Sequence, residues 1–261
     1  MKKYAGLSFT ELQAFLDEKY AQFNVSAFID DDPVSIPHRY SKLADIEIAA
    51  FLTATISWGN RKAILKSANR MMELMQHSPH DFVMNCTARD LKSLHGFVHR
   101  TFNADDLVTF LKALRSLYQE HDSMEHFFSE AIAEHEKTSI AISLFKQRFF
   151  TIPHASRTEK HVSDPLTGSS AKRLNMFLRW MVRKDKNTVD LGLWKSVSTA
   201  HLSIPLDVHS GNVARQLGML TRKQNDLRAV EELDAVLRRL DPTDPVKYDY
   251  ALFGLGAIEK W

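Results

Sequence analysis

Two short segments organise the chain: residues 166–173 read LTGSSAKR, and residues 204–210 read IPLDVHS. Each segment contains turn-forming residues followed by the apolar periodicity of a helix. The first places Lys172 in the opening turn of its helix, and the second places Asp207 at the start of another. A joint function for the two side chains requires that they meet in space.

The composition is that of a soluble globular protein, since 44% of the 261 residues are hydrophobic and 25% are charged. A chain of this length forms one large domain or two small ones. The formal net charge of +2 is compatible with nucleic-acid binding but does not indicate it by itself. The N-terminal segment is polar and no apolar run is long enough to span a membrane, so we expect a cytoplasmic protein.

Metal and thiol sites are not indicated by the sequence. Cys86 is the only cysteine, which excludes an internal disulfide, a thiolate-bound iron–sulfur cluster and a zinc ribbon. The acidic run at residues 30–32 lacks the glycine and the distal glutamate of an EF-hand, so we interpret it as a solvated turn rather than a cation site. His95 and His99 are four positions apart and can share a helix face, but without a carboxylate motif we expect surface or half-buried histidines.

Apolar residues recur at helical spacing through most of the chain, and no run alternates between apolar and polar residues for long enough to indicate a strand. The segment at residues 45–58 is apolar on nearly all sides, which is typical of a buried central helix. We therefore predict an all-α fold. Its helices are expected near Ser8, at residues 45–58, 61–76, 80–85, 88–94, 105–118, 124–135, 138–149 and 225–240, and from Ala171, Asp207 and Pro245 onward.

We predict that residues 1–261 form a single all-α unit with two lobes. One lobe covers residues 40–160 and the other covers residues 161–218. Residues 1–39 and 219–261 are expected to pack onto this core, because the C-terminal segment is strongly apolar.

The predicted helix at residues 61–76 has an apolar face and a basic face. A basic face of this kind can contact phosphates, although a solvated face is the more common role. The residues of this face are Arg61, Lys62, Lys66 and Arg70.

Lys172 has an unusual position for a cation, because the N-terminus of a helix repels positive charge. The adjacent Arg173 adds a like charge, and either Ser169 or Ser170 is expected to cap the helix. Both charge effects favour the neutral amine, which is the nucleophilic form, and the same free N–H groups favour a phosphate. The alternative interpretation is a surface lysine that tolerates its position.

Asp207 also has two interpretations. It is well placed to cap a helix by accepting hydrogen bonds from unpaired backbone N–H groups, which for a lone aspartate is the more common role. His209, Ser210, Asn212 and Arg215 follow on the polar side of the same helix and can contact a ligand.

The two segments together resemble parts of helix–hairpin–helix DNA glycosylases. In that superfamily a leucine–proline–glycine–x–glycine turn leads into a lysine at a helix start, which residues 166–172 resemble. A valine–aspartate–x–histidine segment contains the superfamily's aspartate, and residues 204–209 resemble it. Arg215 and residues 217–218 fit the helix that follows the aspartate. Residues 45–61 are similar to the superfamily's buried early helix and to the turn after it, which meets the duplex.

The resemblance implies a two-lobed helical bundle with the active site in a cleft between the lobes. It implies a DNA glycosylase with abasic-site lyase activity, in which Lys172 is the amine nucleophile and Asp207 is its carboxylate partner. Neither a metal nor another cofactor is implied. The expected partner is duplex DNA with a damaged base or an abasic site, bound by a monomer. The expected DNA contacts are Gly168, Ser169, Ser170, Ala171, Arg173, His209, Arg215, Asn60 and Arg61, with Arg179 and Arg183 as further phosphate ligands.

The sequence departs from the superfamily's pattern at three places. Thr167 replaces the hairpin proline, and Ser170 replaces the second glycine. Lys172 and Asp207 are 35 positions apart, which is a wider spacing than in most of the superfamily. An insertion at residues 184–195 would account for the difference. One archaeal branch that removes oxidised guanine also has a widened spacing, which makes 8-oxoguanine a candidate substrate.

The chain is similar over most of its length to an uncharacterised group of bacterial proteins. The shared segments are KRLNMFLRWMVR at residues 172–183, PLDVH at residues 205–209 and DPVKYDYALF at residues 244–253. This likeness implies no known activity. Two alternatives to the enzyme therefore stay open. One is a non-catalytic nucleic-acid-binding protein of the same fold, and the other is a helical interaction protein with Trp58, Phe97 and Phe102 in a partner groove.

Overall fold

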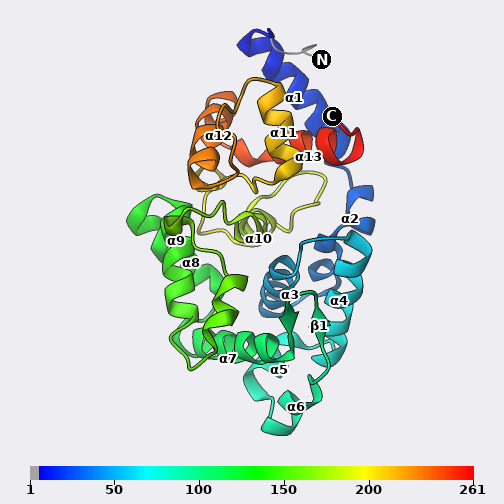
Figure 1. Cartoon of the computed structure of the whole chain (residues 1–261), viewed down its shortest axis with the longest axis vertical. Helices are drawn as coiled ribbons and strands as arrows, with labels where there is room; N and C mark the ends of the chain where they lie inside the picture. Colours follow the sequence, from blue (N-terminus) through cyan, green and yellow to red (C-terminus); the bar gives the residue numbers. More distant parts are fainter. Residues whose placement is uncertain (1–5) are drawn as a thin grey trace.

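A computed structural model describes residues 6–261, which are helical apart from one small hairpin and the connecting turns (Figure 1). The all-α prediction is confirmed. The helices are α1 Phe9–Phe23, α2 Ala27–Asp31, α3 Leu43–Thr55, α4 Arg61–Leu74, α5 Pro79–Asn85, α6 Ala88–Ser93, α7 Ala104–Glu120, α8 Met124–His135, α9 Thr138–Phe149, α10 Lys172–Val182, α11 Val208–Gln216, α12 Leu227–Leu240 and α13 Tyr248–Phe253. Short 3-10 turns lie at Pro33–Ser35, Pro37–Arg39, Ser156–His161, Pro165–Thr167, Thr199–His201 and Pro245–Lys247, and a π turn follows at Gly254–Ile258.

The core consists of two hydrophobic clusters. The first contains buried residues of α3, α4, α5 and α7 to α10, and the second contains residues of α1, α11, α12 and α13. Figure 1 shows the same division, with α10 between the two groups of helices. The lobe boundary at residue 160 stays a prediction, but α10 contributes its buried side chains mainly to the first cluster.

Helix α3 forms the centre of the first cluster. Every residue from Ile46 to Thr55 is buried, as the all-round apolar pattern predicts, and α3 packs against α10. The helix begins at Leu43, two residues before Asp45, so Asp45 does not cap it. Instead the Asp45 carboxylate accepts a hydrogen bond from the backbone N–H of His80 at 2.9 Å, which ties α3 to the start of α5.

Glu47 is a fully buried carboxylate on α3. It accepts hydrogen bonds from the Tyr118 hydroxyl, from the Trp194 indole N–H at 2.7 Å and from two backbone N–H groups at the start of α8. Burial raises the pKa of Glu47, and the hydrogen bond from Tyr118 partly offsets that effect. One carboxylate therefore holds three segments around the central helix, a role that an isolated acid in an apolar run does not reveal.

The segment between α6 and α7 differs from the sequence prediction. His95 and His99 do not share a helix, because α6 ends at Ser93 and His99 lies in strand β1 (Val98–His99). Strand β1 pairs antiparallel with β2 (Phe102–Asn103). Two-residue strands are too short to produce a visible alternation in the sequence.

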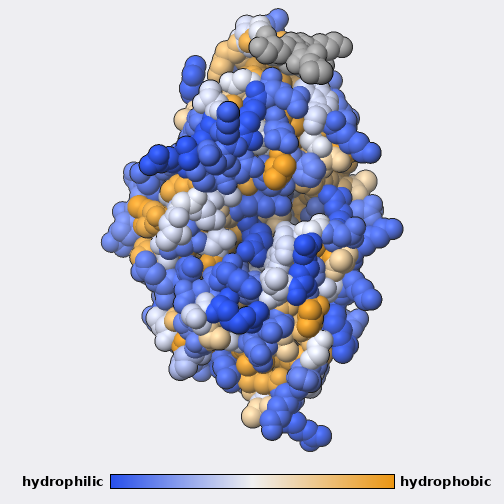
Figure 2. Space-filling model, in the orientation of Figure 1, coloured by the Kyte–Doolittle hydropathy of each residue, from blue (hydrophilic) through white to orange (hydrophobic). Residues whose placement is uncertain are grey.

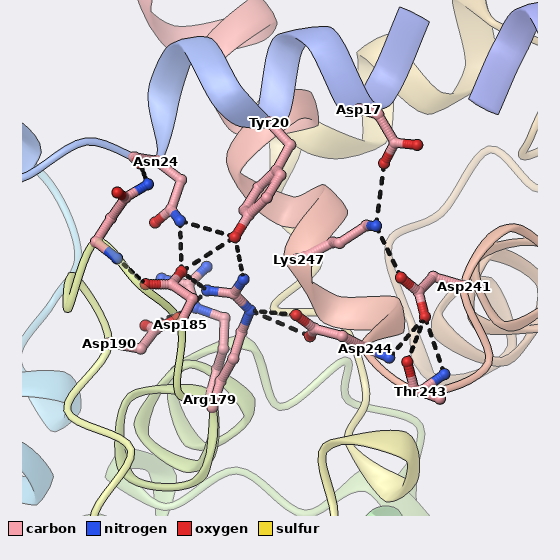
Figure 3. A network of polar contacts seen from close by, with 12 residues as sticks. Asp17, Tyr20, Asn24, Arg179, Asp185, Asp190, Asp241, Thr243, Asp244 and Lys247 are labelled. Carbon is pink, nitrogen blue, oxygen red and sulfur yellow. Dashed lines mark hydrogen bonds and ion pairs between the residues drawn. The ribbon is translucent and has the colours of Figure 1, made fainter. Parts of the chain in front are cut away.

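Two arginines, Arg179 of α10 and Arg183 directly after it, lie in the interior and not on a solvent face. Arg179 is 5% exposed and Arg183 is 1% exposed. Arg179 pairs with Asp190 and Asp249, and Arg183 pairs with Asp185, Asp190 and Asp244. Figure 3 shows Arg179, Asp185, Asp190 and Asp244 within this network. Both guanidinium groups are therefore paired with carboxylates of the protein, which limits their capacity to bind phosphate.

The segment at residues 184–195, which the spacing predicts to be an insertion, contributes buried residues to the core. Val189 and Trp194 are buried, and the backbone N–H groups of Leu191 and Trp194 donate to carbonyl groups at the end of α10. This return of the chain brings Asp185 and Asp190 against α10. Helical periodicity alone cannot predict such a return, because it describes one helix at a time.

Within residues 6–261, no helix combines the length and the apolar character needed to cross a membrane. In the same part of the chain, no group of three or more His, Cys, Asp or Glu side chains is arranged to hold a metal ion. Asp30 and Asp31 belong to α2, and Asp32 is only 9% exposed and accepts a hydrogen bond from the Val34 N–H. The acidic run is therefore not wholly a solvated turn.

Candidate active site

A cavity of about 640 Å³ lies where residues of the two hydrophobic clusters come together. Its wall includes the starts of α10 and α11, the α3–α4 connection, the segment around α2 and the C-terminal helix α13. The polar side chains that line it are Asp32, Ser57, Arg61, Ser163, Ser169, Ser170, Lys172, Arg173, Arg179, Asp207, His209, Asp249 and Tyr250. The apolar and aromatic lining residues are Phe28, Pro33, Trp58, Ile64, Met176, Pro205, Val208, Phe253 and Ala257, together with Gly59.

Lys172 and Asp207 meet in this cavity. The Nζ atom of Lys172 lies 3.3 Å from Oδ2 of Asp207, and the two side chains are 31% and 17% exposed. They come from the first turn of α10 and the N-cap of α11. An amine and a carboxylate in contact with each other and with solvent can exchange a proton and can both reach one bound ligand.

Asp207 divides its two carboxylate oxygens between two roles. Oδ1 accepts hydrogen bonds from the N–H groups of His209 and Ser210 at 2.8 and 3.0 Å, which caps α11. Oδ2 faces Lys172. The capping role expected from the sequence is confirmed, and it leaves the second oxygen available to the cavity.

The turn before α10 is held by its own hydrogen bonds. The N–H groups of Gly168 and Ser169 donate to Pro165 and Asp164, and the N–H of Ala171 donates to the Ser169 hydroxyl at 3.1 Å. Three of the four backbone N–H groups at residues 168–171 thus donate hydrogen bonds within the protein. They are less available to bind a DNA phosphate, which is the role that the resemblance implies. Neither Ser169 nor Ser170 caps the helix; the N-cap is Ala171, with a left-handed φ of 45°.

Arg173 contributes to the cavity wall. Its guanidinium donates to the Thr55 carbonyl and lies 4.8 Å from the centre of the Trp58 ring. Trp58 also stacks on His161, with 5.9 Å between ring centres. Burial lowers the pKa of Arg173 to about 10. The Arg173 guanidinium therefore contacts Thr55 and Trp58. The sequence alone does not predict that Arg173, Trp58 and His161 come together.

The other expected DNA contacts are divided between the cavity and the scaffold. Arg61 and His209 line the cavity. Asn60 caps α4 by accepting from the Ala63 N–H at 3.2 Å. Arg215 donates to the Arg222 carbonyl and to Asn225, so its guanidinium stabilises the loop after α11 and does not line the cavity.

An apolar partner groove at Trp58, Phe97 and Phe102 is not present, because Phe97 is 5% exposed and Phe102 is fully buried. Figure 2 shows a face on which hydrophilic residues predominate and apolar residues are scattered. Such a face lacks the large continuous apolar patch that commonly marks a protein-binding surface.

Asp249 is a buried carboxylate of the cavity that the sequence did not single out. It is 6% exposed, forms an ion pair with the buried Arg179 and lines the same cavity as Lys172. Burial raises the pKa of Asp249 to about 7, while Arg179 lowers it and Asp207 raises it. The DYA sequence at residues 249–251 is unremarkable by itself, and only the packing of α13 brings this acid to the site.

This raised pKa predicts a specific dependence of stability on pH. The folded protein binds a proton at Asp249 up to about pH 7, whereas the unfolded chain releases it near the ordinary value of 3.8. The free energy of unfolding that Asp249 contributes therefore falls as the pH rises through this window, by on the order of 1 kcal/mol per pH unit. Asp249→Asn cannot titrate, so its stability relative to wild type should improve between about pH 5 and about pH 7.5 in urea unfolding. A difference that stays constant over this range would contradict the prediction.

Comparison with known proteins matches the chain to a family model. No curated protein and no solved structure matches the chain significantly. The family model covers residues 32–258, which include every lining residue of the cavity except Phe28. The chain belongs to the family described as "Protein of unknown function (DUF2400)".

Proposed function

We propose that this protein is a DNA glycosylase with abasic-site lyase activity. The observation that carries the proposal is the 3.3 Å contact between the Lys172 amine and the Asp207 carboxylate in a cavity of about 640 Å³. This volume is within the range of small-molecule sites. The resemblance of the two segments to helix–hairpin–helix DNA glycosylases supports the choice of DNA as substrate.

The proposed reaction begins with a damaged nucleotide turned out of the duplex into the cavity. Lys172 transfers a proton to Oδ2 of Asp207, and its nitrogen forms a bond to the sugar C1′. The bond between C1′ and the base breaks, and its electron pair leaves with the base, which takes up a proton. Opening of the sugar ring gives an iminium ion, and loss of a C2′ proton then breaks the C3′–O bond and cuts the strand.

The cavity also has features that suit a planar base. Trp58 and Phe253 line it, and aromatic rings stack on flipped bases in enzymes that act on them. Oxidised guanine, in particular 8-oxoguanine, is the candidate that the wide spacing of Lys172 and Asp207 suggests. In this proposal Asp207 passes the lysine proton to the departing base, and the restored carboxylate then stabilises positive charge on the sugar.

Borohydride trapping of the wild-type protein tests the proposal. Borohydride reduces an iminium ion to a stable amine, so an active enzyme should become covalently attached to a duplex that carries an abasic site or 8-oxoguanine. An undamaged duplex serves as the control and should give no adduct. Binding without an adduct would instead support the non-catalytic nucleic-acid-binding protein, and absence of binding even at low salt would support an interaction protein.

A further inference from the structure

A row of positive charges follows helix α4 away from the cavity. Lys62, Lys66 and Arg70 are exposed and lie at positions i, i+4 and i+8, so they share one side of the helix. Like charges at this spacing destabilise a helix. The first turn of α4 contains no acidic residue, and Arg61 and Lys62 are cations at its positive end. Folding alone does not favour this arrangement.

The row is also poor in compensating acids. Arg70 pairs with Glu73 at 3.1 Å on the same helix. Within residues 6–261, neither Lys62 nor Lys66 has a carboxylate within ion-pair distance, and Arg100 lacks one as well. The local charge is therefore far more positive than the whole-chain value of +2 suggests.

A second hollow lies beside this row. Its volume is about 380 Å³, and Lys66, Arg70 and His95 line it together with apolar atoms of Phe97 and Val98. Val98 is 61% exposed, although it belongs to the short strand β1 that packs beside α4. Cationic side chains around a partly apolar hollow suit a sugar–phosphate segment better than they suit an acidic peptide, because sugar carbons can contact Val98.

The row is continuous with the cavity that contains Lys172. Arg61, the first residue of α4, lines that cavity, and so does Gly59. Arg100, at the tip of the β1–β2 hairpin, lies directly over Gly59: a Cβ atom built there would come within 2.2 Å of its Nη1. From Arg61 to Arg70 the helix extends about 13 Å, which corresponds to about four steps of 3.4 Å along a nucleic-acid strand.

We propose that Lys62, Lys66, Arg70 and Arg100 form a phosphate-binding face that holds the nucleic-acid strand beside the nucleotide in the main cavity. The inference rests on the nucleic-acid partner of the proposed function but not on its covalent chemistry. The bound groups are backbone phosphates, so the face contributes affinity that does not depend on the base sequence or on damage.

Salt-dependent binding of an undamaged duplex tests this face. Fluorescence anisotropy with a labelled duplex gives the affinity of the wild type and of Lys66→Ala/Arg70→Ala over a series of salt concentrations. Loss of two phosphate contacts should lower the magnitude of the slope of log K against log salt by about 2, and the affinity at about 0.1 M salt by more than tenfold. Alanine is compatible with a helix, and both side chains are exposed, so the variant should fold.

The matched control is Lys112→Ala/Lys137→Ala, which removes two exposed positive charges from α7 and the loop before α9. It should keep the wild-type slope and lose little affinity. Equal losses in the two double variants would overturn the proposal, because a general charge effect would then explain both. Failure of the proposed enzyme is a separate result: trapping would give no adduct, while the slope difference between the double variants would persist.

Discussion

Replacing Lys172 with glutamine is expected to abolish the borohydride-trapped adduct and to reduce strand cleavage by about 10³-fold or more. The reaction requires a bond between the lysine nitrogen and C1′, and an amide nitrogen is not nucleophilic enough to form it. Glutamine still offers an N–H donor to Oδ2 of Asp207, which lies 3.3 Å from the amine in the native protein. The variant should therefore keep its fold and its affinity for damaged duplex. Gel analysis after reduction measures the yield of the adduct and the extent of strand cleavage. A thermal melt shows whether the variant keeps its fold.

The control for this substitution is Lys160→Gln, an exposed lysine that precedes the same stretch and does not line the cavity. Its adduct yield should equal that of the wild type. An adduct that persists in Lys172→Gln would show that another amine attacks the sugar. Peptide mapping of the trapped wild-type protein provides an independent check, because the DNA remnant should be attached to the peptide that contains Lys172.

Replacing Arg183 with methionine is expected to destabilise the protein by about 3–5 kcal/mol, which is the usual effect of removing one partner of a buried ion pair. Arg183 is 1% exposed and pairs with Asp185, Asp190 and Asp244. Burial alone would lower the pKa of Arg183, but the carboxylates of Asp190 and Asp244 raise it. Without the guanidinium, Asp185 and Asp244 lose their ion-pair partner, while Asp190 keeps Arg179. Urea unfolding at neutral pH measures the change.

A surface pair gives the matched control for Arg183. Arg222 and Asp226 form an ion pair with side chains that are 30% and 26% exposed. Arg222→Met should therefore destabilise the protein far less than Arg183→Met does, because solvent screens such a pair. Similar losses for the two arginines would contradict the claim that the buried network stabilises the fold.

The sequence predicts the helices well because helix formation leaves a periodic signal within one segment. Helices α8 and α9 begin and end at the predicted residues, and α12 ends at Leu240 as predicted. The all-round apolar pattern of α3 correctly indicates burial. These features depend on residues that are close in the sequence, where hydrophobic spacing and capping are informative.

The candidate site is only partly predictable for the same reason. Two sequence motifs predict the pairing of Lys172 and Asp207, whereas Asp249 and Trp58 reach the cavity through packing of distant segments. Arg179 has the sequence pattern of a solvent-facing residue, yet its partner Asp249 lies 70 positions away. A periodic pattern contains no information on which helix will cover a polar face, and so the buried ion pairs were not foreseen.

The two oxygens of the Asp207 carboxylate have different partners, and this affects how amino-acid variation at positions 172 and 207 among relatives should be interpreted. One oxygen caps α11 and the other contacts Lys172, so selection for folding alone would retain an aspartate here. Lys172 does not cap a helix. It is a cation at the N-terminal end of a helix, where stability favours an acid or a neutral residue. Retention of Lys172 in relatives that tolerate serine or asparagine at position 207 would thus indicate selection for the amine, and Lys172 is the more informative position of the pair.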